Sequence, residues 1–422
     1  MKKFSLYLFM LASLFFVSCS DDNDSDDSEP KPLPKPEVES TFTVNFRLTL
    51  PEDTVVGKLN DVVLYFKDVN TGKKTSYPQK NDSEIYEAKV KKGFYDVNVE
   101  ANYVYTFEGK EVTSKVNGYK QSIQVLQDLN GVEIPLFFEN QESGFVLAEL
   151  FFTGTKTPQG SQYYADKFFV IYNNSDHVLY ADSLAITESK FLTVSKSDYK
   201  PNIMDEAMAV QAVYMIPGDG KTYPVQPGGS ILICDNALDH TKANPNSFDL
   251  TKADFEWVDE STNPNVSDVN NPNVADLKKV YCYTATIWSP HTQGFCSYAL
   301  AKIKTDLDDY IVNYTYNFDY IVVGQTGEAP MSGRCYKIPN SWIVDAVNLS
   351  VPAMFQWIVV DPSLDRGWSY CAEFGWDSRR YGKSVRRKVV SHTEDGRAIL
   401  KDTNNSTVDF ESEQAADPYH KF

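Results

Sequence analysis

Apolar and polar residues alternate in short runs along most of this chain, and no other feature constrains its fold as strongly. The first run, residues 41–50, is apolar at every second position and carries threonine, asparagine or arginine between. Alternation with a period of two places neighbouring side chains on opposite faces of a strand. The 26 tyrosines and 25 phenylalanines also favour strands, and we find no amphipathic helical pattern beyond about three turns. The sequence therefore predicts an all-β protein.

Residues 40–140 contain several such runs at close spacing, which predicts an N-terminal β-sandwich. Within it, the segment KKG at residues 91–93 predicts a tight hairpin turn, and Asn130–Gly131 predicts a second turn. The strand after the first turn carries Gly93, Tyr95, Val97 and Val99. This spacing resembles the prealbumin-like domains related to carboxypeptidase regulatory modules, and the resemblance implies a prealbumin-like or immunoglobulin-like sandwich.

A second β-sandwich is predicted over residues 144–420, after a boundary in the segment FFENQESG. Its expected strands and turns carry Ala148, Glu149, Tyr172, Asn173, Asn174, Pro227, Gly228, Gly229, Ser384, Arg386, Asn405, Asp409 and Phe410. In this order they resemble the lamin-tail domain, an immunoglobulin-like sandwich that is also found in secreted bacterial proteins. Residues 235–370 exceed what that fold needs and are expected to form an insertion. The near-repeat NPNV at residues 263–266 and 271–274 favours a solvated surface loop over a binding surface.

The N-terminus changes from apolar to acidic at Cys19. Lys2 and Lys3 precede an apolar run that is too short to span a bilayer, and the small residue Ser18 lies directly before the cysteine. Residues 1–18 are therefore predicted to be a signal peptide. The segment FVSC at residues 16–19 resembles a bacterial lipobox, which implies cleavage before Cys19, acylation of its thiol and attachment to the membrane through the lipid.

Residues 19–39 are acidic and rich in proline. Their carboxylates repel one another and their prolines favour an extended chain, so we expect a disordered tether. A calcium loop is the alternative, but the tract lacks the glycine and the terminal glutamate spacing of an EF-hand. The acidic tract also resembles the signal that sends Bacteroidetes lipoproteins to the cell surface. This resemblance implies a protein on the outer membrane that faces the cell exterior.

The charge and the cysteines limit the possible partners and cross-links. A formal net charge of −18 disfavours nucleic acid and anionic lipid surfaces as partners. Beyond the acylated cysteine the chain carries Cys234, Cys282, Cys296, Cys335 and Cys371. The spacing does not determine how these pair. Cys282 and Cys296 flank a plausible hairpin, so a disulfide between them stays open.

A search for catalytic motifs finds no nucleophile elbow, zinc-protease motif, phosphate loop or dinucleotide fingerprint, and no metal-ligand spacing. We therefore predict no enzymatic activity, no cofactor and no metal. Asp345 could be half of a catalytic carboxylate pair, but the sequence places no second acid beside it. Exposed aromatic rings are the better candidates for ligand or partner contacts. The basic cluster at residues 379–388 could contact an acidic partner, although pairing with carboxylates of this chain is favoured for it. These candidates are Trp288, Trp368, Trp376, Arg379 and Arg380.

Two further segments, IPGDGKTYPVQPGG at residues 216–229 and KIPNSWIVDAVNL at residues 337–349, extend the likeness to nearly the whole chain. With its lipobox, the chain resembles a family of Bacteroidetes lipoproteins known as domain of unknown function 4876, which implies no established activity. Our leading hypothesis is a surface-exposed, lipid-anchored, non-catalytic protein that binds a partner protein or an extracellular ligand. Family context suggests an outer-membrane nutrient transporter as that partner. The alternatives are a carbohydrate-binding surface protein that uses exposed rings, and a secreted hydrolase with an unrecognised acidic site.

Overall fold

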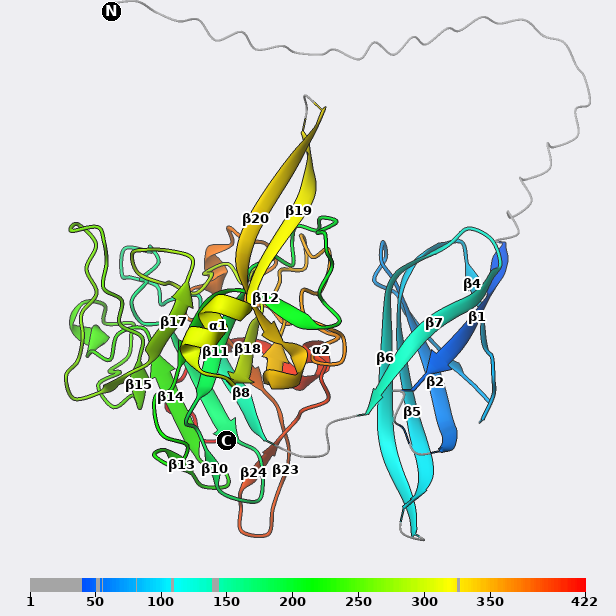
Figure 1. Cartoon of the computed structure of the whole chain (residues 1–422), viewed down its shortest axis with the longest axis horizontal. Coiled ribbons are helices and arrows are strands. Elements are labelled where there is room, and N and C mark those ends of the chain that lie inside the picture. Colours follow the sequence, from blue (N-terminus) through cyan, green and yellow to red (C-terminus); the bar gives the residue numbers. More distant parts are fainter. Residues whose placement is uncertain are drawn as a thin grey trace, which may run out of the picture. The chain divides into compact units, whose positions relative to one another are not determined.

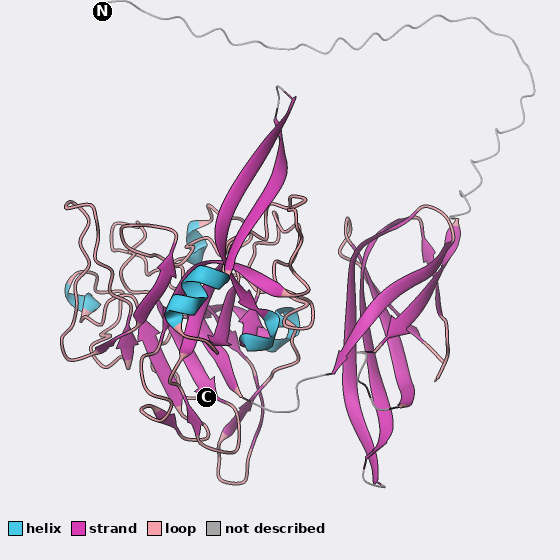
Figure 2. Cartoon of the chain, in the orientation of Figure 1, coloured by secondary structure: helices cyan, strands magenta, loops and turns pink. Residues whose placement is uncertain are grey.

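The computed structural model describes residues 40–50, 54, 56–80, 82–107, 110–138, 144–324 and 327–422. The predicted signal peptide, Cys19 and the expected tether lie outside the described residues. Strands are the prevailing secondary structure of the described chain, which has only a few short helices (Figure 1 and Figure 2). This confirms the all-β prediction. No helix in these described ranges is long and apolar enough to cross a membrane.

The first strands of the chain form one seven-stranded sheet in the order β3-β2-β5-β6-β7-β1-β4. They are β1 (Thr41–Thr49), β2 (Gly57–Asp68), β3 (Lys74–Pro78), β4 (Tyr86–Lys91), β5 (Gly93–Phe107), β6 (Lys110–Val125) and β7 (Leu129–Phe138). Val44 and Phe46 of β1 are completely buried, as the alternation predicts. Tyr95, Val97 and Val99 of β5 join the same core. The resembling G-x-Y-x-V-x-V pattern therefore marks a core face of its strand.

The predictions of two tight turns in this sheet are both wrong. Strands β4 and β5 meet at residues 91–93 but do not pair with each other, because β4 pairs with β1 whereas β5 pairs with β2 and β6. Asn130 and Gly131 lie inside β7, where the register against β1 shifts and Gly131 has a φ of 71°. This is a bulge, which needs the same left-handed backbone freedom as a tight turn.

Most of the remaining strands pack as a sandwich of two seven-stranded sheets. The first sheet contains, in order, β16 (Ala275–Asp276), β15 (Phe255–Glu256), β14 (Ser230–Cys234), β9 (Phe168–Asn173), β8 (Phe145–Phe151), β22 (Lys383–Arg387) and β25 (Phe410–Ala415). The second contains β19 (Thr315–Gly324), β20 (Gly327–Pro339), β12 (Ala207–Met215), β11 (Leu184–Ser189), β18 (Tyr298–Lys302) and β21 (Ile343–Val347), with β17 (Lys278–Cys282) also paired to β12.

Small elements complete this part of the chain. Two short ribbons pair β10 (Leu179–Tyr180) with β13 (Pro224–Val225) and β23 (Val389–His392) with β24 (Ala398–Leu400). The helices are α1 (Leu307–Asn313), α2 (Ser406–Asp409) and three 3₁₀ turns: η1 (His240–Lys242), η2 (Asn340–Trp342) and η3 (Ser378–Arg380). Strand β20 and its partner β19 project beyond the sandwich as a hairpin (Figure 1).

The sandwich core explains the continuous apolar strands of this region. In β9, Phe169 and Ile171 face the second sheet, whereas Phe168, Val170 and Tyr172 pack into a separate cluster on the other face. Loops and the β23–β24 ribbon cover that other face, so every residue of β9 is buried. Strands covered on both sides carry apolar residues without alternation, as this one does.

The expected insertion at residues 235–370 is mostly part of the fold, which corrects that expectation. It contributes β17, β18, β19, β20 and β21, and β18 lies between β11 and β21 in the second sheet. The expectation of a solvated loop holds for the NPNV near-repeats, whose residues are mostly exposed and lie outside the strands. The lamin-tail resemblance does not account for these strands of the second sheet, because they lie far along the chain from their partners.

The hairpin expected between Cys282 and Cys296 is also absent. Cys282 ends β17, which pairs with β12, whereas the strand after Cys296 is β18, which pairs with β11 and β21. All five cysteines of the described residues carry free thiols. Cys234 is completely buried in β14, as its apolar neighbours predict.

Candidate functional site

Two of the five predicted contact residues are inside the protein, so the expectation that they face a partner is wrong. Trp288 is completely buried, with its ring stacked on Tyr214 at 4.7 Å between centroids and tilted against Trp257 at 5.1 Å. Arg380 is only 6% exposed. Trp288 lies in a loop and Arg380 ends the short 3₁₀ turn η3, and in neither place does a period in the sequence show which way a side chain points.

Trp376 is the most exposed of the predicted contact residues that carry a ring. It lies on the loop of residues 372–381, which we call the Trp376 loop, and 73% of its surface is exposed. Phe374 on the same loop is 43% exposed. Gly375 between them packs so closely on the ring of Phe295 that an added Cβ would come within 2.4 Å of it. The backbone between the two rings is therefore held against the core.

Asp377 organises the end of the Trp376 loop. Its carboxylate caps η3 by accepting the backbone N–H of Arg379 at 2.9 Å, and it accepts the guanidinium Nη2 of Arg379 at 2.6 Å. These bonds from Arg379 lower the pKa of Asp377. Arg379 is exposed, but its charge lies against this carboxylate. The loop therefore presents two apolar rings and little net charge.

Arg380 fixes the Trp376 loop from its buried side. Its guanidinium donates to the backbone oxygens of Thr292 and Asp377, each at 3.0 Å, and to Oε1 of Gln162 at 3.3 Å. It also lies over the ring of Tyr381, 4.8 Å from the centroid. A buried arginine with several acceptors positions the segments that supply them. Arg380 thus supports the loop and does not contact a ligand.

Trp368 lies on a different segment from the Trp376 loop. It is partly buried, its ring stacks on Phe355 at 4.8 Å, and its backbone exchanges two 3.0 Å hydrogen bonds with Oγ1 of Thr407. Trp376 and Arg379 were predicted from the sequence, whereas Phe374 and Asp377 were not. The pattern FGWD, two rings around a glycine before an N-capping aspartate, is the signal that could have identified them.

A comparison with known protein families covers the Trp376 loop and most of the sandwich that contains it. The profile of the family described as "Protein of unknown function (DUF4876)" matches residues 226–417. We call these matched residues, which make up less than half of the chain, the DUF4876 region. The chain also matches the crystal structure of a DUF4876 family protein from Bacteroides thetaiotaomicron VPI-5482. The sequence identity is 21% and the TM-score 0.51, over 89% of this chain and 96% of that chain. This likeness shows a shared fold.

Other comparisons add little. A putative adhesin from Bacteroides ovatus ATCC 8483 matches over 74% of this chain and 89% of its own, but with 8% identity and a TM-score of 0.18. The search of curated proteins finds no match. The Trp376 loop and its anchors Asp377 and Arg380 all lie within the DUF4876 region.

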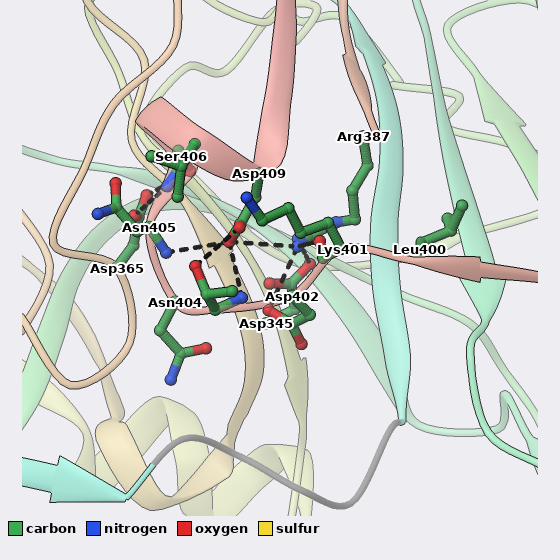
Figure 3. A network of polar contacts seen from close by, with 12 residues as sticks. Asp345, Asp365, Arg387, Leu400, Lys401, Asp402, Asn404, Asn405, Ser406 and Asp409 are labelled. Atoms are coloured by element: carbon green, nitrogen blue, oxygen red, sulfur yellow. Dashed lines mark hydrogen bonds and ion pairs between the residues drawn. The ribbon is translucent and has the colours of Figure 1, made fainter. Parts of the chain in front are cut away.

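The DUF4876 region does place other acids near Asp345, around the buried Arg387 (Figure 3). Arg387 Nη2 donates to Asp345 at 2.7 Å, and Nη1 donates to Asp402 at 3.2 Å and lies 3.9 Å from Asp409. The side chains of Arg387 and Asp345 are 1% and 3% exposed. Burial raises the pKa of Asp345, and the charge of Arg387 opposes that rise. The guanidinium of Arg387 therefore pairs with Asp345 and with the acids near it. These are the acids that could otherwise have formed a catalytic carboxylate pair.

The same network extends through hydrogen bonds to the loops of the DUF4876 region. Leu147 of β8 donates its backbone N–H to Asp345 at 2.6 Å and accepts from Arg387 Nε at 3.0 Å. Asp409 accepts the backbone N–H groups of Thr403 and Asn405 at 2.8 and 3.1 Å (Figure 3). These contacts join β8, β21, β22 and the chain around α2. The network is structural.

Three residues that carry the lamin-tail resemblance form a second buried contact. Glu149 of β8 accepts hydrogen bonds from Ser384 Oγ at 2.6 Å and from Arg386 Nε at 2.8 Å, both on β22. Arg386 and Arg387 thus point to opposite faces of β22, as strand alternation predicts, and each pairs with a carboxylate of this chain. Within the described residues, no group of three or more His, Cys, Asp or Glu side chains could hold a metal ion.

Proposed function

We propose that this chain is a lipid-anchored, non-catalytic binding protein of the cell exterior, which contacts its partner through the Trp376 loop. The observation that carries the proposal is the 73% exposure of Trp376 on a loop fixed by Gly375 and Arg380. Large rings dominate binding hot spots, and a ring held on a rigid turn loses little conformational entropy on binding.

The charge of the Trp376 loop favours an uncharged contact. Two acids, Glu373 and Asp377, balance two arginines on the loop. Its net charge therefore favours neither an acidic nor a basic partner. An apolar protein surface fits this chemistry, and we propose a partner protein such as an outer-membrane nutrient transporter. The face of a neutral sugar ring is the second candidate, because exposed tryptophans stack on such faces. A hydrolase is less favoured, because Arg387 occupies the acids near Asp345.

Removal of the thiol at position 19 tests the proposed anchor. Cys19→Ala eliminates the atom that would carry the lipid, so we expect the protein to move from the membrane fraction to the soluble fraction. Fractionation of cells that express the wild type or the variant measures this shift. Retention of the variant in membranes at the wild-type level would contradict the anchor.

Truncation of the exposed ring tests the proposed contact. We expect Trp376→Ala to weaken binding by roughly 30-fold or more, since hot-spot truncations cost about 2 kcal/mol or more. Pull-down from solubilised outer membranes and a glycan array, both with the full chain, measure protein and sugar binding separately. Tyr283→Ala, which removes another ring that is 55% exposed, is the matched control. Equal binding by the two variants would exclude the Trp376 loop as the contact.

A further inference from the structure

A lysine and an aspartate lie opposite each other, and both are buried, at the ends of two neighbouring strands. Phe168 of β9 pairs with Cys234 of β14, so Lys167 and Asp235 occupy the next pair of opposite positions. The backbone N–H of Asp235 donates to the carbonyl oxygen of Lys167 at 2.9 Å. The two side chains are 0% and 6% exposed, with 3.9 Å between Nζ and Oδ2.

The surroundings of this pair orient both groups. Lys167 Nζ donates to the carbonyl oxygen of Tyr164 at 2.5 Å and to Oγ of Ser289 at 2.7 Å. Asn236 Nδ2 donates to Oδ1 of Asp235 at 3.0 Å. Burial lowers the pKa of Lys167 and raises the pKa of Asp235, because each charged form loses its water, although the attraction between the two groups opposes both shifts. Burial therefore favours a neutral amine beside a protonated carboxyl group.

We propose that Lys167 and Asp235 become joined by an intramolecular isopeptide bond. The lone pair of the neutral Nζ attacks Cγ of the protonated carboxyl group, and a C–N bond forms. One amine hydrogen passes to Oδ2, the Cγ–Oδ2 bond breaks, and one water molecule leaves. The product is a secondary amide that keeps Oδ1 as its carbonyl oxygen and one hydrogen on nitrogen. The step needs no oxidant, reductant or cofactor.

The hydrogen bonds around Lys167 match what this attack requires. A neutral amine has two hydrogens and one lone pair, and Tyr164 and Ser289 supply an acceptor for each hydrogen. The lone pair of Nζ is then free of hydrogen bonds, and Oδ2 of Asp235 lies 3.9 Å from Nζ. Asn236 donates to Oδ1, where negative charge develops when Cγ becomes tetrahedral, and a donor held at that position stabilises the transition state.

The amide also removes an energetic conflict in the core. Two isolated charges buried in a protein each lose several kcal/mol of hydration, and their attraction repays that loss only when the geometry is excellent. At 3.9 Å the Lys167–Asp235 contact is longer than a charge-assisted hydrogen bond. A neutral amide carries no such cost, and it links β9 to β14 covalently.

Peptide mapping of the purified full chain tests this proposal. Trypsin cannot cut after an acylated lysine, so the bond would leave residues 157–190 joined to residues 222–242 in one peptide. After reduction of thiols, we expect its mass to equal the sum of the two peptides minus one water. If separate peptides, including one that ends at Lys167, account for the protein, the proposal is overturned.

Two variants make the test specific. Lys167→Met removes the nucleophile, so we expect residues 222–242 as a linear peptide whose mass shows no loss of water. Asp235→Asn keeps a carbonyl group at the same place, and we expect the same cross-linked mass because ammonia leaves in place of water. Tryptophan fluorescence shows whether each variant is folded. A wild-type chain without the cross-link overturns the proposal, whatever the result for Asp235→Asn.

Discussion

Arg387→Met should lower the free energy of unfolding by about 3–5 kcal/mol, the usual cost of leaving a buried ion pair with one partner. In the wild type, Arg387 compensates Asp345, Asp402 and Asp409. Methionine fills similar space but provides no charge and no donor, so the carboxylates remain buried without a cation. The midpoint of urea unfolding, followed by tryptophan fluorescence, measures the loss.

The fluorescence signal in this experiment is local. All six tryptophans of the chain lie between residues 257 and 376, so the transition reports on the part that contains Arg387. Arg334→Met is the matched control, because Arg334 is exposed on β20, and surface substitutions usually change stability by less than about 0.5 kcal/mol. Equal midpoints for the two variants would show that the buried network does not contribute as argued.

The defect of Arg387→Met should also shrink as the pH is lowered. Burial raises the pKa of Asp345 in the folded state, and loss of the cation removes the effect that opposed the rise. A carboxyl group with a raised folded pKa binds more protons when folded than when unfolded, so its contribution to stability falls as pH rises. We therefore expect the gap between wild type and variant to be smaller at pH 5 than at pH 7.

Strand faces could be predicted from the sequence because alternation is a local property. The buried positions of β1 and the opposite directions of Arg386 and Arg387 on β22 follow from a period of two. The sequence also favoured pairing of the basic cluster with carboxylates of this chain, and Glu149 and Asp345 supply them. These predictions needed no knowledge of which strand lies beside which.

Strand partners and buried loops could not be predicted in the same way. The segment at residues 91–93 has the composition of a hairpin turn, but β1 competes successfully for β4. The expected insertion supplies most of the second sheet because its strands find partners such as β11 and β12 far away in the sequence. Lys167 and Asp235 are likewise separated by 68 positions, and only the pairing of β9 with β14 brings them together. In each case a long-range contact decides the outcome.

Trp288→Ala should lower the free energy of unfolding by about 3–5 kcal/mol, because truncation of a buried large ring leaves a cavity. Trp288 is completely buried against Tyr214 and Trp257. Its backbone N–H bonds to Asp259 at 2.7 Å, and a cavity beside that contact cannot close without moving it. Thermal unfolding followed by circular dichroism measures the loss without relying on the ring that was removed.

Trp376→Ala is the matched comparison for this prediction, because both variants remove the same side chain from loops of the same part of the chain. Trp376 is 73% exposed, so we expect its loss to change stability by no more than about 0.5 kcal/mol. The two variants should therefore separate stability from binding, with Trp288→Ala affecting unfolding and Trp376→Ala affecting the partner. Similar losses of stability in both would mean that the ring of Trp376 packs against the protein, and the proposed contact surface would then be wrong.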